Sequence, residues 1–352
     1  MTQSLSIQPD FRSLCLGEGN TPLVKSRHIG HQLGLPNLYF KMENLNPTGS
    51  YKDRFAASLV NTMLQKQQTQ CIATSSGNTG AALAAYCAAA KIECLVVVVD
   101  GAPQGKLKQM QLYGTELLMV KGFGISASIT SRVMEQLEKI TKQLSLPLPI
   151  SAYRFCPEGM VGVESIAHEI LDELEGPTEI FVPAGGGGLT LAVAKGVAAH
   201  SKTARVHCIQ PEGNDTIATS LRKNIPAQAI GLSTTRISGL QVANVLDGDQ
   251  TIAACQSLGG TGQVVTDERI LHWHKQLAFK EGIFCEPAGA VALAGVEKAL
   301  QNKEIDPQAH LVCLITGSGF KDMATVESSF NLAQVIPQDL EESLHRLSTL
   351  TI

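Results

Sequence analysis

The chain has 352 residues, a formal net charge of -4 at pH 7, 44% hydrophobic residues and 17% charged residues. A chain of this length exceeds what one small core organises, so we expect two lobes with a cleft between them. The composition is ordinary for a globular protein, and no apolar run reaches the roughly eighteen residues that span a bilayer. The net negative charge argues against binding to nucleic acid or to an acidic membrane. We therefore expect a soluble protein with a small-molecule partner.

The N-terminal segment and the cysteines indicate the compartment. The first 14 residues, MTQSLSIQPDFRSL, lack the basic and apolar regions of a secretory signal. Nine cysteines are scattered along the chain with no C-x-x-C pair. Such spacing predicts reduced, mostly buried thiols and no metal site. We expect a cytoplasmic protein.

Short β-branched segments alternate with longer helical segments along the chain. This alternation predicts an α/β fold with a mostly parallel sheet. Ligands in such sheets bind beyond the carboxyl ends of the strands, where loops begin helices. The expected strands lie at 37–43, 71–76, 94–100, 114–120, 179–184, 205–210 and 310–317, and the expected helices at 55–67, 81–91, 126–144 and 189–200.

The segment NPTGSYKDR at 46–54 places Lys52 in the first turn of a helix. A helix N-terminus carries partial positive charge, so it disfavours the ammonium form of this lysine. A neutral amine is what Schiff-base chemistry requires. The alternative is a solvated lysine beside Asp53 and Arg54.

The loop SSGNTG at 75–80 joins an expected strand to an alanine-rich helix. Ser75, Ser76, Asn78 and Thr79 offer hydroxyl, amide and backbone N–H donors at the helix N-terminus, which suits a carboxylate or a phosphate. The alternative is an ordinary helix N-cap.

Four consecutive glycines, Gly185 to Gly188, follow the strand EIFVPA, and the next helix continues from Leu189. Each glycine in ordered structure costs about 1 kcal/mol relative to alanine, so a run of four favours close backbone approach to a ligand. We expect stacked amides that cradle a phosphate. The alternative is a flexible surface loop.

Two further patterns predict no site. Gly122 and Gly124 form a G-x-G-x-x-A match after a strand, but no ribose-binding acid lies at the expected spacing, so we expect an ordinary strand-to-helix turn. His272 and His274 are two residues apart in a helical stretch, which puts their rings on different faces. We expect both histidines on the surface.

Seven motifs follow one another along the chain: GEGNTPL at 17–23, NPTGSYKDR at 46–54, SSGNTG at 75–80, GKLKQ at 105–109, PAGGGGL at 183–189, EGIFCEPAGA at 281–290 and TGSGFKD at 316–322. In this order they resemble the threonine synthase branch of the fold-type II pyridoxal-phosphate enzymes, over about residues 15 to 325. The resemblance implies that Lys52 binds pyridoxal 5'-phosphate covalently and that Asn78 contacts the ring hydroxyl. It also implies that the Gly185 to Gly188 loop with Leu189 holds the phosphate and that Thr316 faces the pyridine nitrogen.

The resemblance also limits the reaction. A neutral hydroxyl at the pyridine nitrogen, where an aspartate would protonate it, moderates the electron sink and favours elimination and replacement over transamination. We expect β or γ elimination or replacement on a small L-amino acid. Threonine synthase proper, and a serine or threonine dehydratase or racemase, are the alternatives. A nicotinamide-dependent oxidoreductase and a cofactor-binding protein without turnover are rivals from other classes.

One segment departs from the threonine synthase pattern Asn-x-x-Arg-x-Glu-Gly-Gln-Lys-Thr, whose polar members help bind a substrate phosphate. The segment keeps Arg154 and places Glu164 where the pattern has its lysine. A glutamate facing a dianionic phosphate is repulsive. We therefore expect Arg154 and Glu164 to line the substrate pocket and to disfavour a phosphorylated side chain.

The resemblance implies two lobes. Residues 1–68 and 151–325 are expected to form the large cofactor-binding lobe, and residues 69–150 a small mobile lobe that carries the carboxylate loop. The tail at 326–352 contains QDLEESLHRL, which predicts an amphipathic helix typical of packing or dimerisation. We expect a homodimer.

Overall fold

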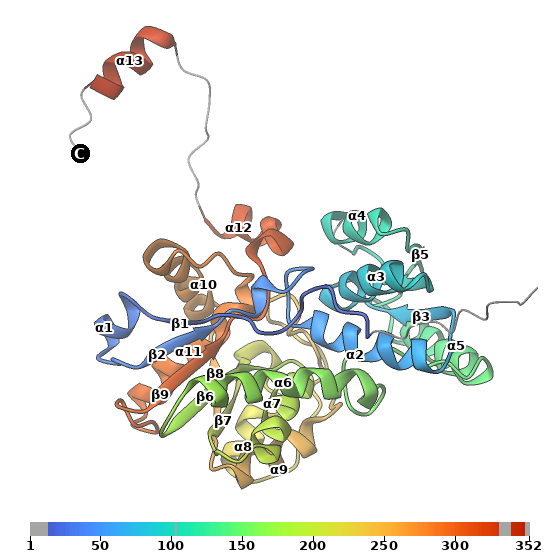
Figure 1. The fold of residues 1–352 in the computed structure, drawn as a ribbon, viewed down its shortest axis with the longest axis horizontal. Coiled ribbons are helices and arrows are strands. Elements are labelled where there is room, and N and C mark those ends of the chain that lie inside the picture. Colours follow the sequence, from blue (N-terminus) through green and yellow to red (C-terminus); the bar gives the residue numbers. More distant parts are fainter. Residues whose placement is uncertain (1–12, 103, 331–338, 349–352) are drawn as a thin grey trace, which may run out of the picture. The chain divides into compact units, whose positions relative to one another are not determined.

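A computed structural model describes residues 13–102, 104–330 and 339–348. The described residues up to Asp322 form one compact unit, and those from Met323 form a second unit. In the compact unit, helices and strands alternate along the chain (Figure 1). The predicted α/β class is confirmed.

A six-stranded sheet organises the larger part of the compact unit. Its strands follow the order β1-β2-β9-β6-β7-β8, and every neighbouring pair is parallel except β1 with β2. The central strand β6 is buried along its whole length, as expected for a strand covered on both faces. The strands are β1 Leu23–Lys25, β2 Leu38–Lys41, β6 Thr178–Pro183, β7 Arg205–Pro211, β8 Gly262–Val265 and β9 His310–Leu314.

A second, three-stranded parallel sheet has the order β3-β4-β5, with β3 Gln70–Thr74, β4 Glu93–Val98 and β5 Glu116–Met119. All three strands lie between residues 69 and 150, and every strand of the six-stranded sheet lies outside that segment. The expected lobes, 1–68 with 151–325 and 69–150, stay a prediction. That the two lobes move as separate bodies stays a prediction.

In the sequence, helix α2 follows β2 of the six-stranded sheet and precedes β3 of the three-stranded sheet. It packs against both α3 and α6 (Figure 1). One hydrophobic cluster includes side chains of both sheets, such as Ala73 and Val182, so the core is continuous across them. Prolines at the first positions of α6 and α11 supply a helical φ where no N–H is needed. The helices of this unit are α1 Ile29–Leu33, α2 Lys52–Gln65, α3 Asn78–Ala90, α4 Gln104–Leu112, α5 Ala127–Gln143, α6 Pro157–Glu173, α7 Gly188–Ala199, α8 Ala218–Lys223, α9 Gly248–Ser257, α10 Asp267–Gln276 and α11 Pro287–Gln301.

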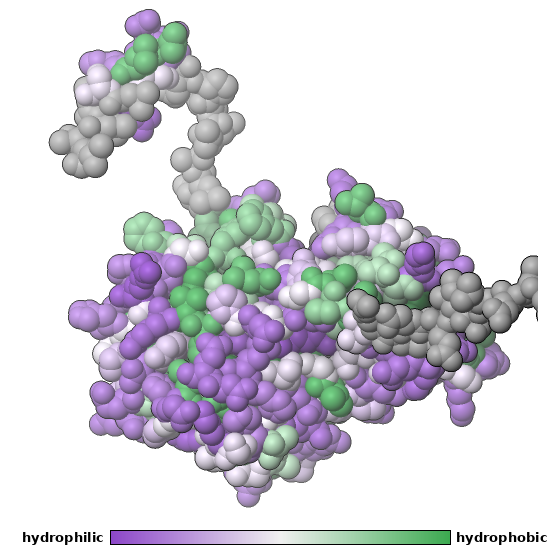
Figure 2. All heavy atoms as spheres, in the orientation of Figure 1, coloured by the Kyte–Doolittle hydropathy of each residue, from purple (hydrophilic) through white to green (hydrophobic). Residues whose placement is uncertain are grey.

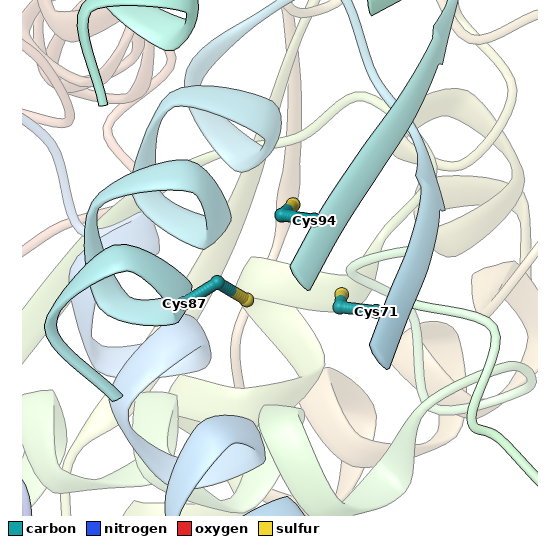
Figure 3. Close-up of side chains that lie close together, drawn as sticks. All are labelled: Cys71, Cys87 and Cys94. Atoms are coloured by element: carbon teal, nitrogen blue, oxygen red, sulfur yellow. The ribbon is translucent and has the colours of Figure 1, made fainter. Parts of the chain in front are cut away.

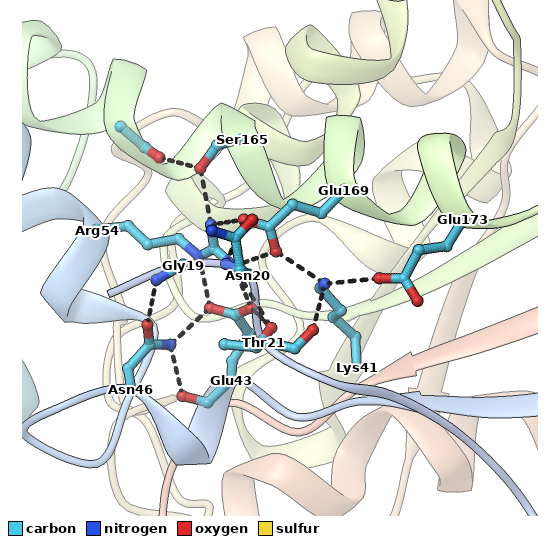
Figure 4. A network of polar contacts seen from close by, with 11 residues as sticks. Gly19, Asn20, Thr21, Lys41, Glu43, Asn46, Arg54, Ser165, Glu169 and Glu173 are labelled. Carbon is cyan, nitrogen blue, oxygen red and sulfur yellow. Dashed lines mark hydrogen bonds and ion pairs between the residues drawn. The ribbon is translucent and has the colours of Figure 1, made fainter. Parts of the chain in front are cut away.

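A buried ionic network holds the start of α2 (Figure 4). The Arg54 guanidinium donates to both oxygens of Glu43 at 2.7 and 2.8 Å, and to both oxygens of Glu169 at 2.5 and 2.8 Å. Lys41, fully buried, pairs with Glu169 at 2.8 Å and donates to the Thr21 carbonyl at 2.7 Å. Burial by itself would raise the pKa of Glu169, but hydrogen bonds from Arg54 lower it to about 2. The charges of this network are therefore paired.

The surface of the compact unit is mostly hydrophilic on the face shown in Figure 2, where hydrophobic residues form small separated groups. Within the described ranges, no helix is long and apolar enough to cross a membrane. All nine cysteines are free thiols, and most of them are buried, as the sequence predicts.

The second unit contains α12 Met323–Ser329 and α13 Leu340–Ser348. Helix α13 confirms the amphipathic helix expected from QDLEESLHRL, of which Gln338 lies outside the described residues. Leu340 and Leu344 lie one turn apart and are 68% and 50% exposed.

The prediction that His272 and His274 both lie on the surface is wrong for His274. Its side chain is buried, with Nε2 2.6 Å from the carbonyl oxygen of Cys285. The physical reason is the helical repeat: Ile270, Trp273, His274 and Leu277 are all buried at the spacing of one helix face. His272 is exposed, as expected.

Candidate active site

Lys52 is the first residue of α2, and the loop after β9 fixes the turn before it. The Tyr51 backbone N–H donates to the Thr316 carbonyl at 3.1 Å, and Ser50 bridges to Gly317 in an antiparallel pair. These contacts bring NPTGSYKDR and TGSGFKD together although they are more than 250 residues apart.

The Lys52 amine lies in a buried, weakly charged environment. Its Nζ donates to the Ser151 hydroxyl at 2.5 Å and lies 4.5 Å from the centre of the Tyr51 ring. Burial lowers the pKa of Lys52 to about 7, against an opposing effect from the Glu286 carboxylate. The low pKa agrees with a neutral amine, but burial is its largest cause; the sequence pointed to the helix N-terminus.

The neighbours of Lys52 in the sequence do not form a solvated charge cluster with it. The Asp53 carboxylate accepts from the Thr48 backbone N–H at 2.8 Å and from its hydroxyl at 2.7 Å. Arg54 belongs to the buried network described above. Lys52 is therefore not part of a solvated charge cluster with Asp53 and Arg54 in this structure.

A buried carboxylate, Glu286, lies between the two expected cofactor-contacting residues. The Asn78 side-chain amide donates to both of its oxygens at 3.0 and 3.1 Å, and the Thr316 hydroxyl donates at 3.4 Å. A Cβ atom on Gly317 would overlap this carboxylate, so a larger residue there would force the carboxylate to move. Burial raises the pKa of Glu286, and the nearby Lys106 opposes that shift.

The SSGNTG loop divides into two pairs. Thr79 Oγ1 lies 3.3 Å from Ser151 Oγ, which joins it to the Lys52 amine, and Asn78 contacts Glu286 as described. Ser75 and Ser76 instead accept backbone N–H groups, from Gly77 at 3.2 Å and from Val99 at 3.0 Å. Helix α3 begins at Asn78, and its second residue, Thr79, is connected through Ser151 to the Lys52 amine.

In the glycine loop Gly185 to Gly188, the first three carbonyl groups accept hydrogen bonds from the protein, whereas the backbone N–H groups donate to none of the described residues. The Gly185 carbonyl accepts from Gln210 at 3.0 Å, the Gly186 carbonyl from the Asp247 N–H at 3.1 Å, and the Gly187 carbonyl from Thr251 at 3.1 Å. Within the described chain, none of the four glycine N–H groups has a protein acceptor. Open N–H groups at the start of α7 suit an anion.

Packing leaves no space for side chains at these glycines. A Cβ atom on Gly186 would lie 3.0 Å from Leu246 Cδ1, and one on Gly187 would lie 2.6 Å from Thr251 Oγ1. Gly187 also has φ +97°, a conformation that L side chains rarely adopt. The next residue, Leu189, is buried in the core and anchors the first turn of α7.

Arg154 and Glu164 contact residues other than Lys52. The exposed Arg154 guanidinium lies 5.6 Å from the Phe155 ring. Glu164 lies on helix α6, and its carboxylate accepts a hydrogen bond from the Tyr153 hydroxyl at 2.6 Å. Among the described residues, neither side chain hydrogen-bonds to a residue of the Lys52 site. Their role in substrate choice stays a prediction.

Two residues of the site, Ser151 and Glu286, were not predicted from the sequence. Ser151 contacts both Lys52 and Thr79, but it stands in no Gly-rich or charged motif, so the sequence carried no signal for it. Glu286 stands in the EGIFCEPAGA motif, and a glutamate directly before a helix-starting proline could have been singled out.

The competing Gly122 turn has no open donors. The Gly122 N–H donates to Asp100 at 2.8 Å, and the Gly124 N–H donates to Thr130 Oγ1 at 3.0 Å. Helix α5 then begins at Ala127 with Ser126 as its N-cap. The expected strand-to-helix turn is confirmed.

Taken together, the site offers one amine of low pKa, a row of open amides and polar atoms without partners. Asn78 Oδ1 and Ser50 Oγ are buried and have no hydrogen-bond partner in the described residues. This donor set suits a ligand that carries both a carbonyl group, for the amine, and an anionic group, for the amides.

Comparisons with known proteins agree with that donor set. A family model described as pyridoxal-phosphate dependent enzyme matches residues 14–317. Threonine synthase from Methanocaldococcus jannaschii is 33% identical over 331 residues, which cover 90% of this chain and 79% of that protein. Threonine synthase from Halalkalibacterium halodurans is 33% identical over 97% of this chain and 94% of that protein. The crystal structure of serine racemase from Dictyostelium discoideum superposes with a TM-score of 0.70 at 25% identity, over 85% of this chain and 92% of that one.

Proposed function

The chain belongs to the family of pyridoxal-phosphate-dependent enzymes, and on that premise we propose that it catalyses elimination or replacement at the β or γ carbon of a small L-amino acid. The observation that carries the proposal is the buried Lys52 amine, whose pKa of about 7 makes it a base and nucleophile near neutral pH. The threonine synthases among its relatives support this class of reaction.

The residues present fit pyridoxal 5'-phosphate. We assign its covalent attachment to Lys52 and its phosphate to the open N–H groups of Gly185 to Gly188, with Leu189 anchoring the helix behind them. Asn78, with a buried oxygen that lacks a partner, would contact the ring hydroxyl, and Thr316 would face the pyridine nitrogen. When bound, the cofactor withdraws electrons from the amino acid and makes its Cα–H bond acidic.

Lys52 is assigned the proton transfer. With a pKa of about 7, its amine can accept the Cα proton and later return it to a leaving group or product. Ser151, which accepts a hydrogen bond from Nζ, positions the amine, and Tyr51 covers it with an aromatic face. Burial of Nζ favours the neutral, reactive form of the amine.

The substrate carboxylate is assigned to Ser75, Ser76, Asn78 and Thr79. The N-terminus of α3 offers N–H donors and a favourable dipole at this point, and Thr79 already lies in the hydrogen-bond chain that reaches Lys52. Binding the carboxylate here would hold Cα next to the amine. Holding a substrate atom beside a catalytic group in this way lowers the entropic part of the reaction barrier.

The side-chain preference is the open choice. We propose a substrate without a side-chain phosphate, because Glu164 stands where the threonine synthase pattern has a lysine. The second candidate is threonine synthesis from O-phospho-L-homoserine, which the 33% identity to two threonine synthases favours. A serine or threonine dehydratase or racemase activity is the third, favoured by the likeness to a serine racemase structure.

A substrate panel separates these candidates. The holoenzyme is mixed with O-phospho-L-homoserine, L-serine, L-threonine and amino acids with neutral leaving groups, while cofactor absorbance, α-keto acid, D-amino acid and L-threonine are measured. We expect O-phospho-L-homoserine to be used about ten- to a hundredfold less well than the best substrate, equivalent to about 1 to 3 kcal/mol. Efficient threonine formation from it would establish the second candidate and remove Glu164 as a specificity residue.

We further propose that the enzyme works in the cytoplasm as a homodimer. Its nine cysteines are unpaired, which suits a reducing compartment. Helix α13 carries two exposed leucines one turn apart, a pattern typical of packing against another chain. Sedimentation of the full chain, compared with a chain ending at Asp339, tests the dimer and the contribution of α13.

A further inference from the structure

Three cysteines from consecutive elements of the small sheet meet at one point (Figure 3). Cys71 lies in β3, Cys87 in α3 and Cys94 in β4, and their sulfur atoms all lie within 4.8 Å of one another. Cys71 and Cys94 are direct partners in the parallel register of β3 with β4. The spacing of cysteines in the sequence gave no sign of this cluster, because 16 and 7 positions separate its members (87 − 71 and 94 − 87).

Among the described residues, these three thiols are the only group of three or more Cys, His, Asp or Glu side chains close enough together to hold one metal ion. Thiolate character is what a metal requires of cysteine.

A fourth side chain points to the same place. Thr115, which directly precedes β5, is 6% exposed, and its hydroxyl has no hydrogen-bond partner by geometry among the described residues. This hydroxyl lies near the Cys94 sulfur. A buried hydroxyl without a partner is rare, and here it can donate to a thiolate.

We propose that Cys71, Cys87 and Cys94 bind one soft, thiophilic metal ion of the Cu(I) class in a three-coordinate, all-sulfur site. The cluster contains no carboxylate or imidazole, so its donor set excludes the hard ions Mg²⁺, Ca²⁺ and Mn²⁺. Zinc sites are almost always four-coordinate, and this cluster offers three sulfurs. Three sulfurs about 2.3 Å from a central ion would be about 4.0 Å apart, a spacing that falls within the 4.8 Å limit of the present cluster.

The surroundings suit such an ion. Cys94 is partly exposed whereas Cys71 and Cys87 are buried, so the ion would enter from the Cys94 side and its thiol protons would leave there. The Thr115 hydroxyl would donate to the Cys94 thiolate and offset part of its charge. A bound ion would join β3, α3 and β4, and so stabilise the helix whose first turn carries Asn78 and Thr79.

The test uses the reduced, full-length holoenzyme and Cu(I) supplied from a chelator buffer. We expect one equivalent to bind, with an ultraviolet sulfur-to-metal absorption band, three sulfur neighbours by X-ray absorption spectroscopy and a higher Tm. Cys87→Ala should abolish binding; the residue lies in an alanine-rich helix, where alanine packs well. Cys156→Ala, a buried cysteine of the same hydrophobic cluster outside the triad, is the matched control and should bind normally.

Each other outcome overturns the proposal. Binding that survives Cys87→Ala places the ion elsewhere. Tighter binding of Zn²⁺ than of Cu(I) in chelator competition overturns the assigned ion class. If Cys87→Ala does not fold, the sulfur count on the wild-type protein decides, because fewer than three sulfur neighbours excludes the triad. Catalytic turnover enters none of these readouts, so they are independent of the proposed reaction.

Discussion

Two polar clusters lie at the start of helix α2, and they differ in how far their donors are satisfied. Arg54 gives four short hydrogen bonds to Glu43 and Glu169, and Lys41 completes the group. Two residues earlier, Lys52 has one hydroxyl partner, Ser151, and no carboxylate. The amides of the glycine loop Gly185 to Gly188 have no acceptor in the described chain.

The difference separates structure from chemistry. A buried charge that lacks a partner is costly, so a closed network such as that of Arg54 is what stability requires. The Lys52 side keeps donors open and an amine with a pKa of about 7, which a fold tolerates where a ligand supplies the missing partners. The closed cluster should therefore respond to mutation through stability, and the open cluster through binding and turnover.

The largest expected effect is on the open side, at Lys52. Lys52→Ala should remove the visible absorbance of the lysine-bound cofactor and reduce turnover by about 10³-fold or more, because the attachment point and the base are lost together. The unfolding midpoint of the cofactor-free protein should change little, since no ion pair is broken. Retained absorbance and turnover would mean that another lysine holds the cofactor.

The corresponding change on the closed side is Arg54→Ala. It leaves the buried Glu43 without its cation and the half-buried Glu169 with Lys41 as its remaining cation, so the free energy of unfolding should fall by about 3 to 5 kcal/mol in urea titrations. The matched control at the other end of α2 is Lys66→Ala, whose exposed pair with Glu158 should contribute less than about 1 kcal/mol. Equal losses in both variants would show that the Arg54 network adds no special stability.

The sequence predicted the open side better than the closed one. Motifs around Lys52, Asn78, the glycine loop and Thr316 are local, so each could be found by its own residues and order. The Arg54 network joins residues from four separate segments, and the sequence carries no pattern that pairs them.

The same limit applies to single contacts within the site. Ser151 reaches Lys52 only because the fold brings residues 99 positions apart together. Burial lowers the pKa of Lys52, and the side chain of His274 is also buried. Both features depend on tertiary packing, which could not be predicted from this single sequence. Alternation of strands and helices, by contrast, is periodic, and it predicts the α/β class that the structure has. The expected segments still leave out strands β1 and β8 and helices α1, α4, α6, α8, α9 and α11.

The glycine loop tests whether open amides mean a bound anion. Gly186→Asp should weaken cofactor affinity about ten- to a hundredfold, because the new carboxylate repels a phosphate and its Cβ crowds Val242 and Leu246. Equilibrium dialysis of pyridoxal 5'-phosphate measures the effect. Gly231→Asp is the matched control, since a Cβ there meets nothing within 4 Å. Equal affinity in both variants would place the phosphate elsewhere.

The pH dependence of cofactor attachment tests whether Lys52, unlike the paired Arg54, is neutral near pH 7. The folded pKa of Lys52 is lowered, so its amine is mostly protonated below about pH 7 and mostly neutral above it. The rate at which the cofactor-free protein captures the cofactor should rise about tenfold per pH unit below pH 7 and level off above it. Stopped-flow absorbance measures that profile. A rate that still rises steeply above pH 9 would mean that Lys52 keeps the ordinary pKa of an exposed lysine.

The smallest expected effect distinguishes the substrate from the cofactor within the open cluster. Thr79→Val keeps the shape of the side chain but removes the hydroxyl that lies 3.3 Å from Ser151 Oγ. If the N-terminus of α3 holds the substrate carboxylate, one lost hydrogen bond should raise KM about three- to tenfold, equivalent to about 0.5 to 1.5 kcal/mol. The spectrum of the resting enzyme should stay unchanged, because the lysine and the glycine loop are untouched. Ser76→Ala is the comparison, since that hydroxyl accepts the Val99 N–H and its loss should alter local order as well as KM. A Thr79→Val enzyme with an altered resting spectrum and an unaltered KM would assign this loop to the cofactor and leave the substrate carboxylate without a site.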